Sequence, residues 1–253
     1  MEHIWHCDRL ADEVDLFVAA VVDADLATPV PTCPGWDLAE LIRHTGLVHR
    51  WAGYLVEHTA PQRVPSDEVG TAFPDDDASL PQWLGEGGRA LVAILRAADP
   101  ATSMWAWGPD PHVRFWSRRQ LHETAVHRAD AQLAIGEAPV IEPAVAVDAV
   151  DELLANVASA GYFAPNTERL RGEGESIHLH CTDAAGLDGE WMITLLPDRF
   201  EWSRAHGKAT VAVQGPASDL LLLVYNRRSR ADDRFEIFGD VALLDFWLEN
   251  SAL

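Results

Sequence analysis

Apolar residues recur at helical spacing through the first half of the chain. The pattern predicts helices over residues 4–24, 37–58, 80–98 and 115–135, because apolar side chains three or four positions apart fall on one helix face. Asp37 is placed to cap the second helix, with Glu40 three residues later. Four such helices indicate an N-terminal four-helix bundle.

Segments rich in Pro, Gly and Asp separate these helices. The stretch TPVPTCPGW (28–36) interrupts the helical pattern, and WAWGPDPHV (105–113) does so again. Residues 60–79 form a longer polar segment, which we expect to be a loop at the rim of a functional site.

The pattern changes after about residue 140. A helix is expected over 144–160, followed by alternating segments typical of strands at 176–181, 190–196, 199–205 and 209–215, and by helices over 216–226 and 240–250. The expected class is therefore α+β, with a helical bundle over 1–140 and a smaller α+β domain over 141–253.

The amino-acid composition limits the binding partners and the cellular location that we expect. With 19 basic and 40 acidic residues the formal charge is 19 − 40 = −21. A chain this acidic repels phosphate backbones and anionic lipids, so we expect no nucleic-acid partner and no membrane partner.

The three cysteines, Cys7, Cys33 and Cys181, lie far apart and form neither a disulfide framework nor a CxxC zinc motif. No apolar run is long enough to span a bilayer, and a reducing cytoplasm is the expected location.

Two polar residues in the fourth predicted helix are candidates for a functional site. Glu123 and His127 are four positions apart, so both project from one helix face. The pair can be a surface hydrogen bond, a buried polar contact, or two ligands of one metal ion. A catalytic zinc ion has three protein ligands and an open position, so the third ligand should come from a facing helix.

The second helix offers two histidines for that third position. His44 and His49 point about 140° apart and cannot both aim at one point. The apolar stripe of this helix is centred closer to His44, so we expect His44 to face the bundle core more directly than His49. In the fourth helix, His122 is excluded from the Glu123/His127 face by the same spacing argument.

Three segments resemble a known family. VPTCPGWDLAELIRHTGLVHRWA (30–52) and RRQLHETAVHRADAQLA (118–134) are similar to two motifs of the mycothiol-dependent maleylpyruvate isomerases, which belong to a larger DinB-like group of metal-binding bundles. EWMITLLPDRFEW, VAVQGPASDLLLLVYNRR and FEIFGDVALLDFWL resemble the family's sterol-carrier-like C-terminal domain.

The resemblance implies a site and a reaction. Its ligand set maps onto His44, Glu123 and His127, and an assisting C-terminal arginine maps onto Arg227 or Arg228. It implies Zn²⁺ or another divalent metal, mycothiol as thiol cofactor, and isomerisation of maleylpyruvate to fumarylpyruvate or a related S-transfer on a small electrophilic substrate. A small-molecule substrate and the thiol are then the expected partners.

Two other functions remain open at the level of sequence. The chain can be a non-catalytic small-ligand binding protein whose metal is structural, closed by a fourth ligand such as His122 or His49. It can also be a zinc-dependent hydrolase, with Asp130, one turn beyond His127, as the candidate general base.

Overall fold

The computed structural model describes residues 2–252. The chain forms two compact units, and it passes from the first to the second between Val140 and Ile141. Within the described residues, no helix is both long and apolar enough to cross a membrane.

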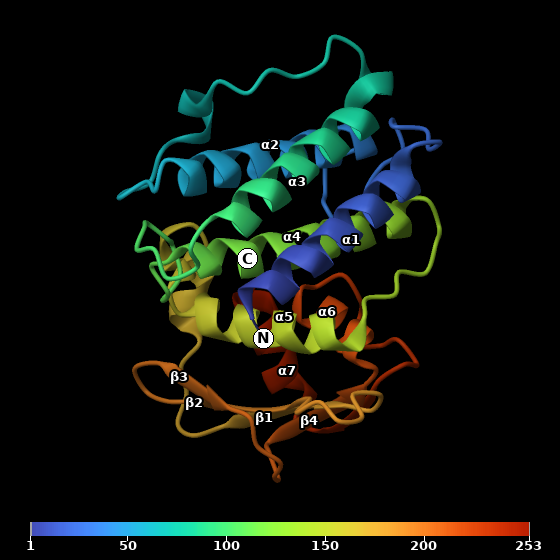
Figure 1. Ribbon diagram of the computed structural model, residues 1–253. Helices are drawn as coiled ribbons and strands as arrows, with labels where there is room; N and C mark the ends of the chain where they lie inside the picture. The colour runs from blue at the N-terminus through green and yellow to red at the C-terminus, as the bar shows by residue number, and fades with distance from the viewer. Residues whose placement is uncertain (1, 253) are drawn as a thin grey trace. The chain divides into compact units, whose positions relative to one another are not determined.

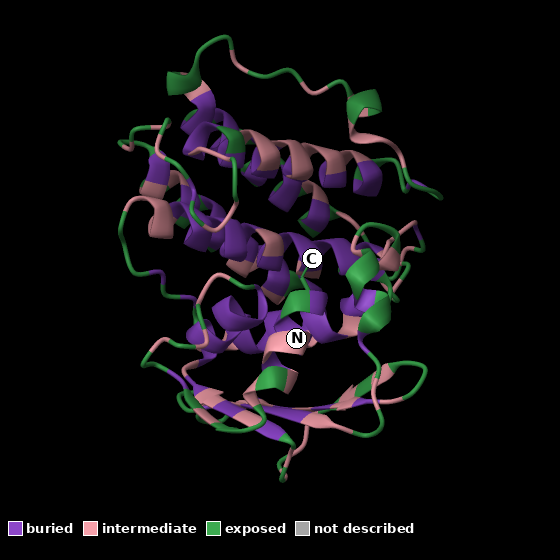
Figure 2. Ribbon diagram, turned by 180° about the vertical axis from the view of Figure 1, so that it is seen from behind, coloured by how far each residue is buried: buried purple, intermediate pink, exposed green. Residues whose placement is uncertain are grey.

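The N-terminal unit is a bundle of four helices (Figure 1). Their bounds are α1 (His3–Val21), α2 (Leu38–Glu57), α3 (Leu80–Ala97) and α4 (Val113–Ala134). Helix α4 packs against α1 and α2, and α3 packs against α1 and α2. Figure 2 shows buried residues along the helix faces that meet, while the long connection between α2 and α3 is mostly exposed. The predicted bundle is confirmed.

Helix α2 begins where the sequence predicts a cap. The Asp37 side chain accepts a hydrogen bond from Glu40 N (2.8 Å), and the Glu40 side chain accepts one from Asp37 N (3.1 Å). This reciprocal pair satisfies two backbone donors that have no partner within the helix. It therefore fixes the first turn of α2, from which the register of His44 follows.

The 60–79 connection is the expected loop, with two short 3-10 helices at Ser66–Val69 and Asp77–Ser79. Two indoles hold it to the bundle. Trp51 Nε1 donates to Val64 O (2.7 Å), and Trp83 Nε1 donates to Ala72 O (3.0 Å).

The C-terminal unit combines one sheet with helices that cover one of its faces (Figure 1). Its helices are α5 (Pro143–Val157), α6 (Ala217–Val224) and α7 (Val241–Asn250), with 3-10 turns at Ala160–Tyr162 and Pro165–Arg169. Its strands are β1 (Ser176–Cys181), β2 (Glu190–Leu195), β3 (Phe200–Ser203), β4 (Val211–Gly215) and β5 (Glu236–Gly239). The predicted α+β class is confirmed.

The sheet order is β3-β2-β1-β4-β5. Strand β1 pairs in parallel with β4, and the other neighbours are antiparallel. Alternate residues Ile177, Leu179 and Cys181 of β1 are buried, as expected for the face covered by helices. His178 and His180 therefore lie on the opposite face.

The sequence pattern missed β5. This strand has only four residues and forms one edge of the sheet, while the equally short β3 forms the other edge. Most of β5 is exposed, so no buried apolar alternation marks it in the sequence.

Candidate metal centre

Helices α2 and α4 bring three metal-ligating side chains to one point. His44 comes from α2, and Glu123 and His127 come from consecutive turns of α4. One ligand atom from each lies within 4.8 Å of the other two. The sequence analysis named these three residues, and the structure brings their side chains together across the interface between α2 and α4.

The distances between these atoms match the edges of a small coordination polyhedron. Glu123 Oε1 lies 3.5 Å from His44 Nε2 and 3.2 Å from His127 Nε2. A four-coordinate zinc ion with bonds of about 2.0–2.1 Å holds its ligand atoms about 3.3 Å apart. The donor set, two imidazole nitrogens and a carboxylate oxygen, is also one that zinc accepts in catalytic sites. The three residues therefore fit a divalent ion of this kind.

Asp130 fixes the orientation of the His127 ring. His127 Nδ1 donates to Asp130 Oδ2 (2.9 Å), and Cys33 Sγ donates to the same oxygen (3.5 Å). Asp130 is fully buried. Because Nδ1 is engaged, Nε2 is the nitrogen that faces Glu123 and His44. A carboxylate behind a histidine in this way is the common partner of a metal-bound imidazole.

Arg119 fixes Glu123 from one turn earlier in α4. Its Nη2 donates to Glu123 Oε2, which leaves Oε1 toward the two imidazoles. Burial alone would raise the pKa of Glu123, but Arg119 and the hydrogen bonds from His127 and His44 hold it well below the ordinary value. Glu123 is therefore a carboxylate, which is its ligating form.

His127 lies in a negatively charged environment. Burial alone would lower its pKa, but Asp130, Cys33 and Glu123 raise it well above the ordinary value. The same carboxylates that favour an added proton on His127 favour a cation placed between its Nε2 and Glu123.

The site is accessible from the side of His44. The exposed fraction of the side chain rises from 10% for His127 to 22% for Glu123 and 36% for His44. The Trp36 ring lies beside His44, with ring centroids 4.9 Å apart. Of the three ligands, His44 is therefore the one that an outside donor reaches first.

The helical-wheel expectation for His49 is wrong. His49 is fully buried and its Nε2 donates to Thr124 Oγ1 (2.9 Å), whereas His44 is half-buried. Burial lowers the pKa of His49 to about 3. The apolar stripe of α2 serves two neighbours, α3 and α4, so its centre does not identify the residue that faces α4. His44 meets α4 at the edge of the interface.

Neither His49 nor His122 closes the site as a fourth ligand. Among residues 2–252, the candidate group that includes His44 consists of His44, Glu123 and His127, and His127 belongs also to a neighbouring group with Cys33 and Asp130. His122 is fully buried, and its ring lies 6.4 Å from that of His6. This arrangement argues against the closed structural site considered from the sequence.

The candidate arginines lie in the C-terminal unit, just after α6. Arg228 is paired through Nε with Asp219 Oδ1 (2.6 Å), and Arg227 Nη1 donates to Tyr225 O (2.8 Å). The catalytic role of Arg227 or Arg228 stays a prediction.

Sequence reasoning missed Arg119 and Cys33. The spacing of Arg119 to Glu123, four positions on a helix, was visible in the sequence but reads equally as a surface ion pair. Cys33 precedes the Pro-Gly turn, and only the folded chain brings it to Asp130.

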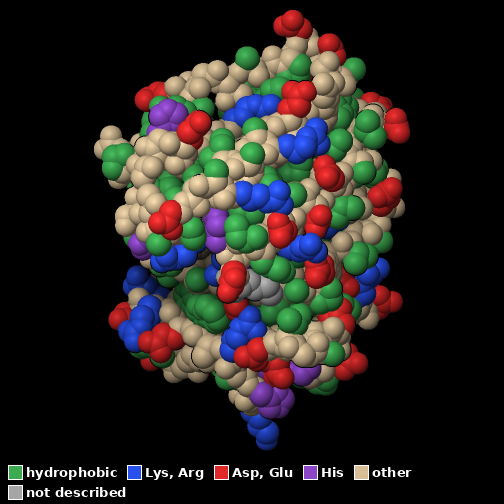
Figure 3. All heavy atoms as spheres, viewed as in Figure 1, with side chains coloured by type: hydrophobic (Ala, Val, Ile, Leu, Met, Phe, Trp, Pro, Cys, Tyr) green, Lys and Arg blue, Asp and Glu red, His purple; other side chains and the backbone are tan. Residues whose placement is uncertain are grey.

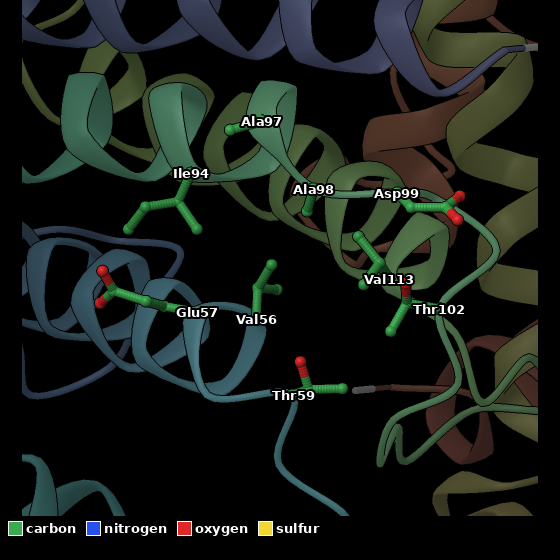
Figure 4. A pocket seen from close by; sticks show the side chains of 9 residues that line it. All are labelled: Val56, Glu57, Thr59, Ile94, Ala97, Ala98, Asp99, Thr102 and Val113. Atoms are coloured by element: carbon green, nitrogen blue, oxygen red, sulfur yellow. The ribbon is translucent and has the colours of Figure 1, made fainter.

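A second hollow in this unit, of about 370 Å³, is separate from the candidate ligands. Figure 4 shows it between the ends of α2 and α3 and the start of α4, with Val56, Ile94 and Val113 among its lining residues. Its lining holds no histidine or cysteine. It is therefore not a second candidate for the metal centre.

Comparisons with known proteins agree with the fold and the motifs. Residues 7–132 match the mycothiol maleylpyruvate isomerase N-terminal domain, and residues 144–246 match the C-terminal domain of the same family. The chain belongs to the mycothiol maleylpyruvate isomerase family. A search of curated proteins returned no match.

Two solved structures are similar to the whole chain. They are crystal structures of the mycothiol-dependent maleylpyruvate isomerase and of its histidine-to-alanine mutant, with TM-scores of 0.58 and 0.60. Each is 12% identical, and the match covers 94% of this chain and 93% of the other. At this identity the likeness establishes the fold family and not the substrate.

Proposed function

We propose that this protein is a zinc-dependent enzyme that uses a low-molecular-weight thiol, mycothiol, to isomerise or S-transfer a small electrophilic substrate. The observation that carries the proposal is the three-ligand group His44, Glu123 and His127, which has an accessible side and no fourth protein ligand among the described residues. Membership of the mycothiol maleylpyruvate isomerase family supports the thiol and the reaction class.

The donor set suits the proposed chemistry. A bound zinc ion would lower the pKa of a thiol and so supply a thiolate nucleophile near neutral pH. Two neutral imidazoles and one carboxylate leave a divalent ion with a net charge of +1. That remaining charge favours an anionic fourth ligand such as a thiolate.

The residues around the ligands supply orientation. Asp130 keeps His127 Nε2 directed at the site, and Arg119 keeps Glu123 Oε1 directed at it. Neither ligand has to reorient when an ion binds, which lowers the entropic cost of binding.

The hydrolase alternative is less well supported. A general base must reach the proton that it removes, directly or through one water. Asp130 contacts His127 on the Nδ1 side of the ring, opposite to the open side of the group. It is therefore placed to orient the ring and not to activate a water beyond Nε2.

The first test is metal content together with thiol-dependent isomerisation of maleylpyruvate, using protein purified without a histidine tag. We expect His127→Ala to hold one zinc ion per chain fewer than the unsubstituted protein and to lose the thiol-dependent activity. His58→Ala is the matched control, because His58 is exposed and bonds only its own helix end. Unchanged metal content and activity in His127→Ala would overturn the proposal.

A second measurement tests the thiol separately from the substrate. Protein loaded with Co²⁺ should gain a sulfur-to-metal absorption band when mycothiol is added, and His127→Ala should not. Absence of the band in the unsubstituted protein would contradict thiol binding at this ion, whatever the true substrate is.

A further inference from the structure

A second group of metal-ligating side chains lies in the C-terminal unit. It consists of His178 and His180 on β1, Glu190 on β2 and His206 in the connection from β3 to β4. One ligand atom from each lies within 4.8 Å of all the others. None of these residues belongs to the site described above.

The sheet itself creates this arrangement. His178 and His180 are two positions apart on a strand, so both project from the same face. Glu190 is the direct cross-strand partner of His180. This is the sheet face opposite to that covered by α5, α6 and α7, and Figure 3 shows histidine side chains (purple) exposed on this side of the unit.

The connection after β3 adds the fourth residue. A Cβ at Gly207 would lie 3.4 Å from Met192 Cε, so the backbone beside His206 runs close to the side chains of β2. The His206 side chain is 77% exposed, yet its ring lies 5.5 Å from that of His178, between centroids.

All three imidazoles converge on a single oxygen atom. Glu190 Oε2 lies 3.0 Å from His178 Nε2, 3.2 Å from His180 Nδ1 and 2.6 Å from His206 Nδ1. A carboxylate oxygen offers about two lone-pair directions, which the contacts with His178 and His206 use. Among the described residues, His180 Nδ1 is buried and has no hydrogen-bond partner. A cation among the four groups would use every one of these atoms as a ligand.

We propose that His178, His180, Glu190 and His206 form a second divalent-metal site, with a His₃Glu donor set that suits Zn²⁺ or a similar transition-metal ion. Three imidazoles and a carboxylate fill a tetrahedral shell, which is the arrangement of structural zinc sites. An ion here would link β1 and β2 to the β3–β4 connection and hold that connection on the sheet.

The test is zinc binding by the full chain with the first site disabled. In the His127→Ala background we expect one equivalent of Zn²⁺ to bind, measured by calorimetry and by metal content after dialysis. Adding His206→Ala or Glu190→Gln should lower the affinity by at least about tenfold, since even loss of an outer-shell partner costs about 10–100-fold. His206 is exposed, so its substitution leaves the fold intact.

The control is His58→Ala in the same background, which should bind zinc unchanged. Co²⁺ serves as a second probe, because a four-coordinate site gives strong visible absorption and a hydrated ion does not. The proposal is overturned if His127→Ala protein binds no zinc, or if its affinity survives both His206→Ala and Glu190→Gln. These outcomes leave the N-terminal site untouched, so the two proposals fail separately.

Discussion

At the scale of single residues, the partners behind the ligands decide which atoms face the candidate N-terminal site. The helical spacing of Glu123 and His127 was readable from the sequence. Their hydrogen bonds to Arg119 and Asp130 were not, because a spacing does not say which of two ring nitrogens or carboxylate oxygens is engaged. The sequence therefore predicts the ligand types and their approximate position, and the structure adds their orientation.

Asp130 gives a prediction at this scale. Asp130→Ala removes the acceptor that holds His127 Nδ1, so we expect zinc affinity at the N-terminal site to fall by about 10–100-fold. The measurement is competition with a chromophoric chelator in the Glu190→Gln background, which isolates the first site. Asp130→Asn retains an acceptor oxygen and should lose less. Equal affinities for Asp130→Ala and the unsubstituted residue would show that His127 needs no such support.

The three cysteines give a second prediction. Burial raises the pKa of Cys7 to about 11 and that of Cys181 to about 12, so at pH 8 about one thiol in a thousand or fewer is the reactive thiolate. Cys33 is only partly buried. Iodoacetamide should therefore label Cys33 first in the native protein, and all three after unfolding in urea, as read by mass spectrometry. Labelling of native Cys181 as fast as Cys33 would contradict this burial.

At the scale of elements, sequence patterns located the long helices and the central strands well. The start of α2 was predictable because Asp37 and Glu40, three positions apart, form a capping box, which is recognisable in the sequence. Strand β5 and the side of α2 that faces α4 were not predictable. Strand β5 has only four residues and is mostly exposed, so its sequence shows no apolar alternation. Helix α2 packs against both α3 and α4, so its apolar residues do not indicate which side faces α4.

The crossing of α2 and α3 is sensitive to one methyl group. A Cβ at Gly46 would lie 2.1 Å from Trp83 Cζ3. The indole is held by its bond to Ala72 O and by the Arg50 guanidinium 3.8 Å from its ring centroid. We expect Gly46→Ala to lower the free energy of unfolding by about 1–3 kcal/mol, measured by urea denaturation.

Gly53→Ala is the matched control in the same helix. A Cβ there would meet the flexible ends of Ile94 (3.2 Å) and Leu91 (3.8 Å). Since alanine is the better helix former, this change should be neutral or should stabilise by up to about 1 kcal/mol. Equal losses of stability at both positions would refute the account based on Trp83.

At the scale of the whole molecule, each of the two units holds a group of side chains that could bind a metal ion. The composition predicted a strongly acidic protein, and the motifs predicted the N-terminal ligand group. The second histidine group escaped the sequence reading because its members come from two strands and a loop, which only the sheet register brings together. An HxH spacing alone is too common to mark a site.

The short outer strands of the C-terminal sheet have a further consequence. β3 and β5 each have four residues, and β5 ends at Gly239, whose φ of +94° turns the backbone out of the strand conformation. A strand from a neighbouring molecule could form only a few backbone hydrogen bonds with either edge strand. At β5 it would also lie beside the charged Glu236 side chain. The two edges of this sheet thus discourage strand-by-strand growth into fibrils.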